Sequence, residues 1–273
     1  MKHISEAKRN TKSWPLNIGY SHNHHNMEII DIIKDCTIAN GNIIKLPDVQ
    51  LDRADYLKVK KLMESNGGKW KGGKCQGFLF NTTDVTPILI RLQGGDLTDR
   101  KKKFQFFATP PNIAMRLAVR LGDVSSSDRI LEPSAGTGSL VKAVLDEWPD
   151  CIVDCYELMP ENRSELEKIN NAHVLGDDFL TAEVGMYDKI IANPPFAKNQ
   201  DILHVTKMWE HLNKGGQMAV IMSCHWQFAQ DKDSVRFREL VYNVDHDITT
   251  LPAGSFKESG TNIETVMLVL WKN

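Results

Sequence analysis

Several features that would place the chain in a familiar class are missing from its sequence. No apolar run approaches the about 18 residues of a membrane-spanning helix, and the N-terminal segment lacks the apolar core of a signal peptide. The five cysteines form no Cys-x-x-Cys pair, so neither a zinc site nor a disulfide framework is indicated. We therefore expect a cytoplasmic protein with no metal site and no membrane partner.

The composition is that of an ordinary globular protein, but its charge is unevenly distributed. Hydrophobic residues make up 41% of the 273 positions and charged residues 25%. Residues 1–110 hold 18 Lys and Arg against 11 Asp and Glu, a net charge of +7, whereas residues 111–273 carry −9. A basic segment often binds a polyanion such as nucleic acid, although a merely solvated surface is an equal alternative. We expect a basic module over residues 1–104 and an acidic domain over 105–273.

The basic module has the pattern of a small α+β unit. Helical spacing predicts helices near 27–33, from about residue 52, and over 88–92, with strands at 43–44 and 78–80 and an unstructured arm over 1–26. In one hypothesis Trp70 stacks on a base while neighbouring lysines contact phosphates. In the other, Trp70 fills the module's own core. The nucleic-acid-binding candidates are Lys69, Trp70, Lys71, Lys74, Arg100, Lys101, Lys102 and Lys103.

In the acidic domain, strands alternate with helical stretches. This alternation is typical of a Rossmann-like, doubly wound, mostly parallel sheet, here of seven strands, and the short link between the last two strands predicts an antiparallel hairpin at its edge. In such sheets ligands bind beyond the carboxyl ends of the strands. The predicted strands cover 129–132, 152–157, 173–175, 189–193, 217–222, 247–251 and 266–271.

A glycine-containing turn follows the first of these strands. Gly136 and Gly138 lie where the chain passes from strand to helix, which lets the backbone approach a nucleotide-like ligand closely. The third glycine of the dinucleotide fingerprint is replaced by Val141, so a ligand without phosphates fits better. Glu157 comes 19 residues after Gly138, close to the about 20 at which an acid accepts ribose hydroxyls. A solvated strand end is the alternative for Glu157.

The most informative motif is Asn193-Pro194-Pro195-Phe196, which ends an apolar strand. The prolines cannot continue a hydrogen-bonded ladder and they fix the backbone. The side-chain oxygen of Asn193 and the carbonyl oxygen of Pro194 are then expected to point together into the cleft, with Phe196 as an aromatic wall. A strand ended by ordinary turn prolines is the alternative.

Together these motifs resemble the class I S-adenosylmethionine-dependent methyltransferases that act on amines. Phe106-Phe107-Ala108-Thr109-Pro110, Glu132 to Gly138, Gly176-Asp177-Asp178-Phe179 and the Asn-Pro-Pro-Phe motif follow one another in the order of gamma-class DNA adenine-N6 methyltransferases. The resemblance covers residues 105–273. It implies S-adenosylmethionine as cofactor, a bacterial or phage-infected cell as the setting, and methyl transfer to a flipped-out adenine in duplex DNA.

The resemblance also implies a role for individual residues. Asn193, Pro194, Pro195 and Phe196 would form the catalytic motif, with Phe196 and Phe256 stacking on the target base. Glu157 would hold the ribose hydroxyls, and Asp178 with Phe179 the adenine of the cofactor. The implied cofactor-binding residues are Thr109, Glu132, Pro133, Ser134, Ala135, Gly136, Gly138, Glu157, Asp178, Phe179 and Asn193.

The substrate has alternatives. Asn-Pro-Pro-Phe also resembles motifs of methyltransferases acting on RNA amines or, usually with Tyr in the last place, on a glutamine of release factors. A non-catalytic DNA-binding or anti-restriction protein is a further alternative. Gamma-class enzymes usually carry a large recognition domain after the core, whereas Asn273 directly follows the last predicted strand. Target recognition is therefore expected from residues 1–104, with help from the segment between Cys224 and Arg238. A homodimer or a partner subunit is a separate expectation, and the sequence leaves the recognition site and any companion endonuclease open.

Overall fold

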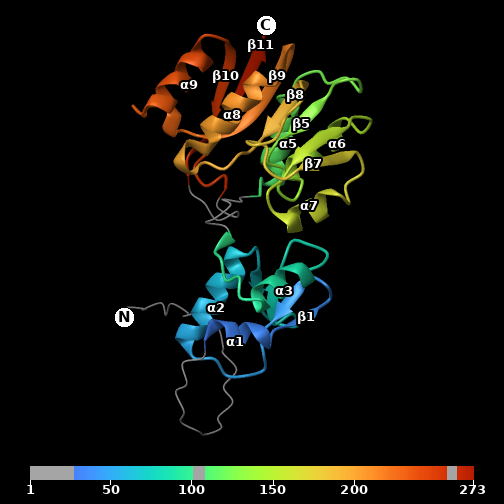
Figure 1. The fold of residues 1–273 in the computed structure, drawn as a ribbon, viewed down its shortest axis with the longest axis vertical. Helices are drawn as coiled ribbons and strands as arrows, with labels where there is room; N and C mark the ends of the chain where they lie inside the picture. Colours follow the sequence, from blue (N-terminus) through green and yellow to red (C-terminus); the bar gives the residue numbers. More distant parts are fainter. Residues whose placement is uncertain (1–27, 101–107, 257–262) are drawn as a thin grey trace, which may run out of the picture.

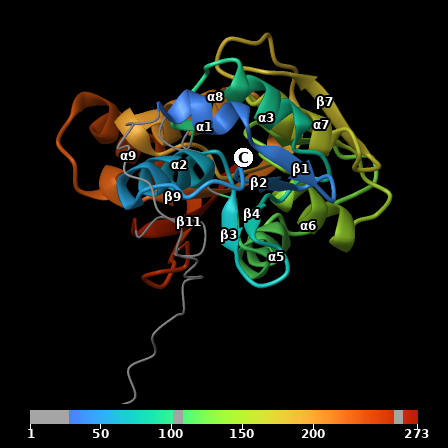
Figure 2. The same cartoon turned by 90° about the horizontal axis from the view of Figure 1, so that it is seen from below.

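The computed structural model describes residues 28–100, 108–256 and 263–273. A small N-terminal unit and a larger α/β part, each with its own sheet, follow one another along the long axis of the molecule (Figure 1). Seen along that axis, α1 to α3 lie in front of the larger part (Figure 2). No helix within the described ranges is long and apolar enough to cross a membrane. The predictions for residues 1–26 and for Lys101, Lys102 and Lys103 concern positions outside those ranges.

Within its described residues, the N-terminal unit packs three helices against a four-stranded antiparallel sheet, which confirms the predicted α+β pattern. The strand order is β1-β2-β4-β3, and only β2 and β4 were predicted as strands. A single hydrophobic cluster, with Phe78 fully buried in it, joins the helices to the sheet. The elements are α1 (Ile29–Lys34), β1 (Thr37–Ala39), β2 (Ile43–Lys45), α2 (Arg53–Ser65), β3 (Lys69–Lys71), β4 (Gly77–Leu79) and α3 (Thr86–Gln93).

Helix α2 shows how local sequence sets these elements. The carboxylate of Asp52 accepts a hydrogen bond from the backbone N–H of Asp55 at 2.8 Å, which caps the first turn. Val59, Leu62 and Met63 recur at helical spacing and are all buried. Gly67, with φ of +95°, lets the chain turn away from the helix end toward β3.

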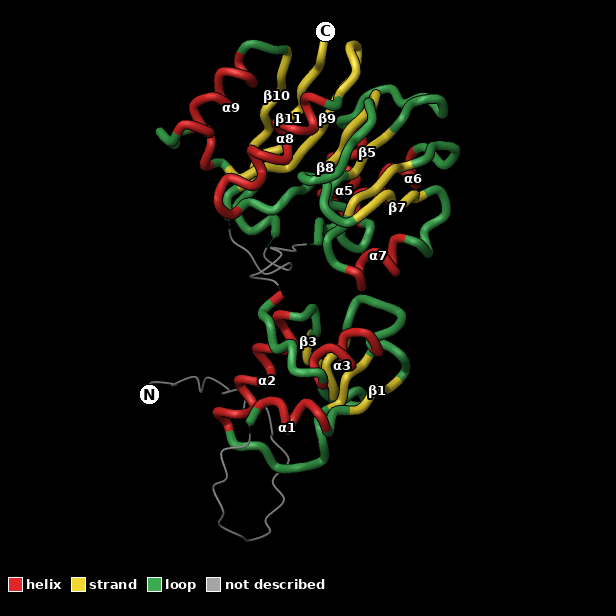
Figure 3. The backbone as a smooth tube through the Cα atoms, in the orientation of Figure 1, coloured by secondary structure: helices red, strands yellow, loops and turns green. Residues whose placement is uncertain are grey.

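The larger part contains the predicted seven-stranded sheet, and each of the seven predicted strands is present. The order is β10-β11-β9-β8-β5-β6-β7 (Figure 3). The pairs from β9 to β7 are parallel, whereas β11 runs antiparallel to both β9 and β10, as expected for an edge hairpin. The strands are β5 (Ile130–Glu132), β6 (Val153–Tyr156), β7 (Ala172–Gly176), β8 (Tyr187–Ala192), β9 (Leu212–Ser223), β10 (Asp245–Thr250) and β11 (Thr265–Lys272).

Helices cover both faces of this sheet. Alternate residues of a strand point to opposite faces, so Ile130 packs with one hydrophobic cluster and Leu131 with the other. The first cluster includes α5 (Pro111–Val119) and α6 (Ser139–Glu147). The second includes α8 (Gln200–Glu210) and α9 (Lys232–Tyr242). Burial on two faces explains the continuous apolar runs over residues 218–222 of β9 and 266–271 of β11.

The order of strands places the predicted site residues at one edge. Strand β5 lies between β6 and β8, so the direction of strand progression reverses at β5. Because the three strands are parallel, Glu132 at the end of β5, Glu157 just after β6 and Asn193 just after β8 emerge at the same end of the sheet. Such a reversal point is where open α/β sheets bind ligands.

We predict that Gly138→Ala destabilises the fold more than Gly215→Ala. Both glycines have positive φ, +85° and +77°, but a Cβ at Gly138 would lie 2.4 Å from Cδ1 of Ile169, whereas nothing lies within 4 Å at Gly215. The shared backbone strain cancels between the two, which leaves about 1–3 kcal/mol of overpacking at Gly138. Urea unfolding of both variants measures the difference. Equal losses would show that the contact with Ile169 relaxes without cost.

Candidate active site

Most of the predicted cofactor-site residues line one cavity at the carboxyl edge of the sheet. Gly138 and Pro194 contribute to the two loops but do not line the cavity. Among the residues that the structure describes, no Lys or Arg side chain lines the cavity, which agrees with a ligand that carries no phosphate. The predicted residues on its wall are Thr109, Glu132, Pro133, Ser134, Ala135, Gly136, Glu157, Asp178, Phe179, Asn193 and Pro195.

Glu132 is a buried carboxyl group at the start of the glycine loop. Its Oε1 accepts hydrogen bonds from the backbone N–H of Ser134 at 3.1 Å and from the Ser134 hydroxyl at 3.2 Å. Burial raises the pKa of the Glu132 carboxyl well above its usual value, against the effect of the Ser134 bonds, and the neighbouring charge of Glu157 raises it further. A positively charged group in the cavity would favour the ionised form.

Glu157 is tied into the protein by both of its oxygens. Oε2 accepts from the N–H of Gly136 at 2.8 Å, and Oε1 accepts from the N–H of Met159 at 2.8 Å and from Nδ2 of Asn162 at 3.1 Å. Burial raises the pKa of this carboxyl, while these three bonds oppose the rise. A carboxylate has about four acceptor positions, so Oε2 has room for one hydroxyl, and a second on Oε1 would replace Asn162.

The residues present fit S-adenosylmethionine. Two buried carboxyl groups in one cavity favour a ligand with positive charge, and Glu157 can accept from a ribose hydroxyl. Phe179 adds an aromatic wall on the side of Asp178. Among the described residues, no group of three or more His, Cys, Asp or Glu side chains is arranged to hold a metal ion.

Asn193 enters the cavity directly after β8, where Pro194 and Pro195 stop the strand. Its Nδ2 donates a hydrogen bond to Oγ1 of Thr109 at 3.1 Å. Thr109 is 6% exposed and lies just before α5, 84 residues earlier in the chain. The bond fixes the orientation of the Asn193 amide at the cavity wall.

Two residues of α8 support the cavity, one from behind its wall and one on it, and no sequence motif pointed to them. Nζ of Lys207 donates to the backbone carbonyls of Phe179, Leu180 and Ala182 at 2.7, 3.1 and 2.7 Å, which holds the Asp-Phe loop in place. One turn earlier, His204 lines the cavity and stacks on Phe179, with ring centroids 6.0 Å apart. Their spacing of three residues on one helix is the only signal in the sequence that they act together.

The protonation of His204 follows from its partner. Nδ1 lies 2.8 Å from the carbonyl oxygen of Gln200, so Nδ1 carries the hydrogen and Nε2 is an acceptor. Burial lowers the pKa of His204, against the effect of the Gln200 bond and the charge of Asp178, and the charge of Lys207 lowers it further. The cavity therefore has a neutral imidazole on its wall.

The two predicted base-stacking aromatics are packed inside the protein. Phe196 is 9% exposed and Phe256 is 2% exposed, and both belong to the hydrophobic cluster that also contains α5 and α6. In this structure Phe256 therefore packs as a core residue. Stacking on a base requires either ring to move from this position, and that role stays a prediction.

The described residues among the predicted nucleic-acid contacts do not form one patch. On β3, Trp70 pairs with buried Phe78 and packs edge-on against it, with ring centroids 5.1 Å apart. Lys69 and Lys71 are its neighbours on the strand and so point to the opposite face, where they are exposed, as is Lys74. Because β3 is an edge strand, these lysines also prevent edge-to-edge pairing.

Arg100 differs from the predicted solvent-exposed role. It is 9% exposed, and its Nη1 forms an ion pair with Oε2 of Glu161 at 2.6 Å. A guanidinium held in this way is not presented to a phosphate. Contact with a phosphate would require Arg100 to leave Glu161, its partner 61 residues later in the chain, and the nucleic-acid role of Arg100 stays a prediction.

We predict that His204→Gln makes the protein less sensitive to acid. Since the pKa of folded His204 is lowered, the unfolded chain binds a proton first as the pH falls below about 6.5, and stability is lost. His204→Gln removes this loss, so its free energy of unfolding should fall less than that of the wild type between about pH 7 and pH 5. Urea unfolding across this range provides the test. His246→Gln, on the exposed edge strand β10, is the control; identical pH profiles for wild type and His204→Gln would refute the prediction.

Comparison with known proteins finds a family and several relatives that match part of the chain. The family described as "Methyltransferase small domain" matches residues 113–244. Release factor glutamine methyltransferase from Escherichia coli is 34% identical over 80 residues, 27% of this chain and 29% of that enzyme. Modification methylase CviBIII from a Paramecium bursaria Chlorella virus is 27% identical over 165 residues, 52% of this chain and 44% of that enzyme. The matched region thus spans less than half the length of either relative.

Among solved structures, the EcoKI M protein, described as a type I restriction enzyme, superposes with a TM-score of 0.51. The match covers 72% of this chain and 49% of that protein at 15% sequence identity, which shows a shared fold. The reversal of strand order at β5, the glycine loop and the match over residues 113–244 agree with one another. Residues 113–244 therefore match the methyltransferase small domain family, and the seven-stranded sheet has the Rossmann-like fold expected of S-adenosylmethionine-dependent methyltransferases.

Proposed function

We propose that the chain transfers a methyl group from S-adenosylmethionine to the N6 amine of adenine in DNA. The observation that carries this proposal is the Asn193 amide, whose orientation Thr109 fixes inside the cavity that also contains Glu132 and Glu157. An oriented acceptor next to two buried acids suits the capture of an amine beside a cationic methyl donor. We also propose the division into a basic module, residues 1–104, and a catalytic domain, residues 105–273.

The cofactor would be held by residues already in position. Glu157 would accept a ribose hydroxyl, and Glu132 with the loop of Ser134 to Gly138 would face the charged methionine end. Asp178 and Phe179 would contact the adenine, with His204 on the same wall. When bound, S-adenosylmethionine supplies a methyl group on a positively charged sulfur.

Asn193 would orient the amine of the substrate. Its side-chain oxygen and the carbonyl oxygen of Pro194 would each accept one amine hydrogen. The lone pair of an adenine amine is delocalised into the ring, and two such bonds favour a tetrahedral nitrogen whose lone pair points at the methyl group. This mechanism depends on positioning and electrostatics, and no covalent intermediate with the protein is needed.

DNA as the substrate is supported by a relative and by charge. CviBIII, described as a modification methylase, aligns with 52% of the chain, more than the release-factor enzyme does. The net charge of +7 over residues 1–110 suits a polyanion. An adenine inside a duplex cannot reach the cavity, so it would have to leave the base stack.

A glutamine side chain of a protein is the second candidate substrate. The release factor glutamine methyltransferase from Escherichia coli shares 34% identity over its matched 80 residues, which is higher than the identity to CviBIII. An amide nitrogen also has a delocalised lone pair that Asn193 would redirect. The basic N-terminal unit is the feature that favours nucleic acid over this alternative.

We predict that Asn193→Ala reduces methyl transfer to duplex DNA by about 10²-fold or more, since it removes an acceptor needed in the transition state. Cofactor affinity should stay nearly unchanged, because Asn193 contacts the amine more than the cofactor. Labelled methyl transfer and calorimetric titration of the cofactor measure the two quantities. Asn243→Ala, at the exposed end of α9, is the control. The assigned role would be contradicted if methyl transfer and cofactor affinity fell equally, or if neither of them fell.

We predict that the double variant Lys69→Ala, Lys71→Ala weakens the salt dependence of duplex binding. Each phosphate contact contributes about −0.9 to the slope of log affinity against log salt, so losing both should flatten the slope by about 1.8. Lys214→Ala is the control and should leave the slope unchanged. Lys214 is exposed and lies near the start of β9, at the end of the sheet away from the candidate site. Fluorescence anisotropy over a salt series tests this. An unaltered slope in the double variant would exclude this face of β3 from the DNA interface.

A further inference from the structure

Helix α7 (Pro160–Leu166) belongs to the segment that fixes the carboxylate of Glu157. The N–H of Met159 and the side-chain amide of Asn162 both donate to Oε1 of Glu157. Arg163 donates from Nη1 to the carbonyl oxygens of Glu157 and Leu158, at 2.7 and 3.1 Å. Residues 157–163 are thus one hydrogen-bonded unit, and a movement of α7 changes the acceptor positions that Glu157 offers.

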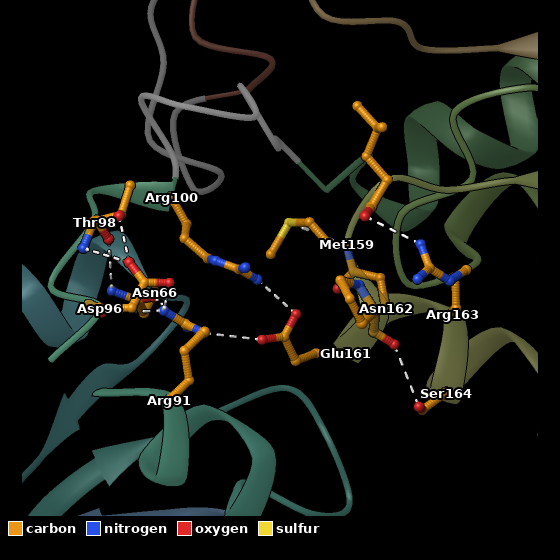
Figure 4. Close-up of polar contacts among 12 residues, drawn as sticks. Asn66, Arg91, Asp96, Thr98, Arg100, Met159, Glu161, Asn162, Arg163 and Ser164 are labelled. Carbon is orange, nitrogen blue, oxygen red and sulfur yellow. Dashed lines mark hydrogen bonds and ion pairs between the residues drawn. The ribbon is translucent and has the colours of Figure 1, made fainter. Parts of the chain in front are cut away.

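The same helix is held by the N-terminal unit through Glu161. Nε of Arg91 lies 3.1 Å from Oε1 of Glu161, and Nη1 of Arg100 lies 2.6 Å from Oε2 (Figure 4). The three side chains are only 15, 16 and 11% exposed for Glu161, Arg91 and Arg100. Arg91 is itself fixed, since its Nη2 donates to Oδ1 of Asn66 at 2.7 Å. Ion pairs with so little exposure are screened less by water than surface pairs.

A second contact lies one turn further along α7. Oε1 of Glu165 accepts from the hydroxyl of Thr82 at 2.6 Å and from the N–H of Thr83 at 3.4 Å. Glu161 and Glu165 are four residues apart, so they lie on one face of the helix. Asn162, next to Glu161, donates from its side-chain amide to Glu157. Helix α7 therefore contacts the N-terminal unit with one face and Glu157 with another.

We propose that Glu161 is a positioning residue through which the N-terminal unit sets the acceptor geometry of Glu157, so that cofactor affinity depends on how this unit is held. The proposal rests on the proposed role of Glu157 in binding ribose. The physical path is short: Arg91 and Arg100 hold Glu161, its neighbour Asn162 occupies an acceptor position of Glu157, and that position is one a second ribose hydroxyl needs.

This arrangement implies coupling in both directions. A ligand whose binding moves the N-terminal unit would shift α7 and change the affinity for the cofactor. The cofactor must then change the affinity for that ligand by the same factor. Duplex DNA, which we propose for the basic unit, is such a ligand. A junction with only a structural role would lower stability without changing the affinity for the cofactor at a temperature where the protein is folded.

The test compares cofactor affinity in the full chain by isothermal titration calorimetry with S-adenosylmethionine. Glu161→Gln removes the charge between the two arginines and does not touch the cavity wall. We expect its cofactor dissociation constant to rise by about 5–20-fold, within the usual range for coupling between sites, while kcat at saturating cofactor stays near the wild-type value. Glu239→Gln, the same substitution at an exposed position on α9, should change neither quantity.

Arg91→Gln provides the same test from the other side of the junction, and it keeps the proposal testable if Glu161→Gln folds poorly. The losses of cofactor affinity in the two single variants should not add in the double variant, because both substitutions break the same ion pair between Arg91 and Glu161. Additive losses, or an unchanged dissociation constant in either folded single variant, would overturn the proposal. Glu157→Gln distinguishes a failure of the coupling proposal from a failure of the proposed role of Glu157. If it weakens the cofactor while Glu161→Gln does not, only the coupling fails; if it has no effect, the role of Glu157 fails, and the coupling proposal with it.

Discussion

The parallel pairing of β5 with both β6 and β8 is the constraint on which the site depends. It brings the ends of three strands together, and with them Glu132, Glu157 and Asn193. Burying two carboxyl groups in one cavity is unfavourable, as the raised pKa values of both acids show. Hydrogen bonds from the glycine loop and from the start of α7 offset part of this cost. A cavity of this kind favours a cationic ligand with hydroxyl groups.

The polar partners of this cavity come from distant parts of the chain. Thr109, which precedes α5, orients Asn193, and Lys207 on α8 holds the Asp-Phe loop from behind. On the other side, α7 joins Glu157 to the N-terminal unit through Glu161. Truncating the N-terminal unit would therefore expose the buried face of α7 as well as remove positive charge, so point substitutions separate these effects better than a deletion does.

The sequence was most informative where local chemistry decides structure. Alternating apolar segments and the prolines after Asn193 predicted the strands and where they end, and the motif order placed Glu157 and Asp178 on one cavity. Side-chain contacts that depend on how distant strands and helices pack together could not be predicted from the sequence. Trp70 turns toward Phe78 and away from its neighbouring lysines because β3 pairs with β4. The partner of Arg100 lies 61 residues away, and His204 belongs to no motif, so only the fold brings them to their contacts.

The central claim is that Asn193 presents an adenine amine of DNA to the methyl donor. It is tested most directly by incubating the full chain with methyl-labelled S-adenosylmethionine and equal amounts of duplex DNA, ribosomal RNA and a release factor. The nucleosides and amino acids of each acceptor are then separated and identified by mass spectrometry. We expect the label in N6-methyldeoxyadenosine from the DNA. Label confined to glutamine or to RNA nucleosides, or absent from all three acceptors, would contradict it.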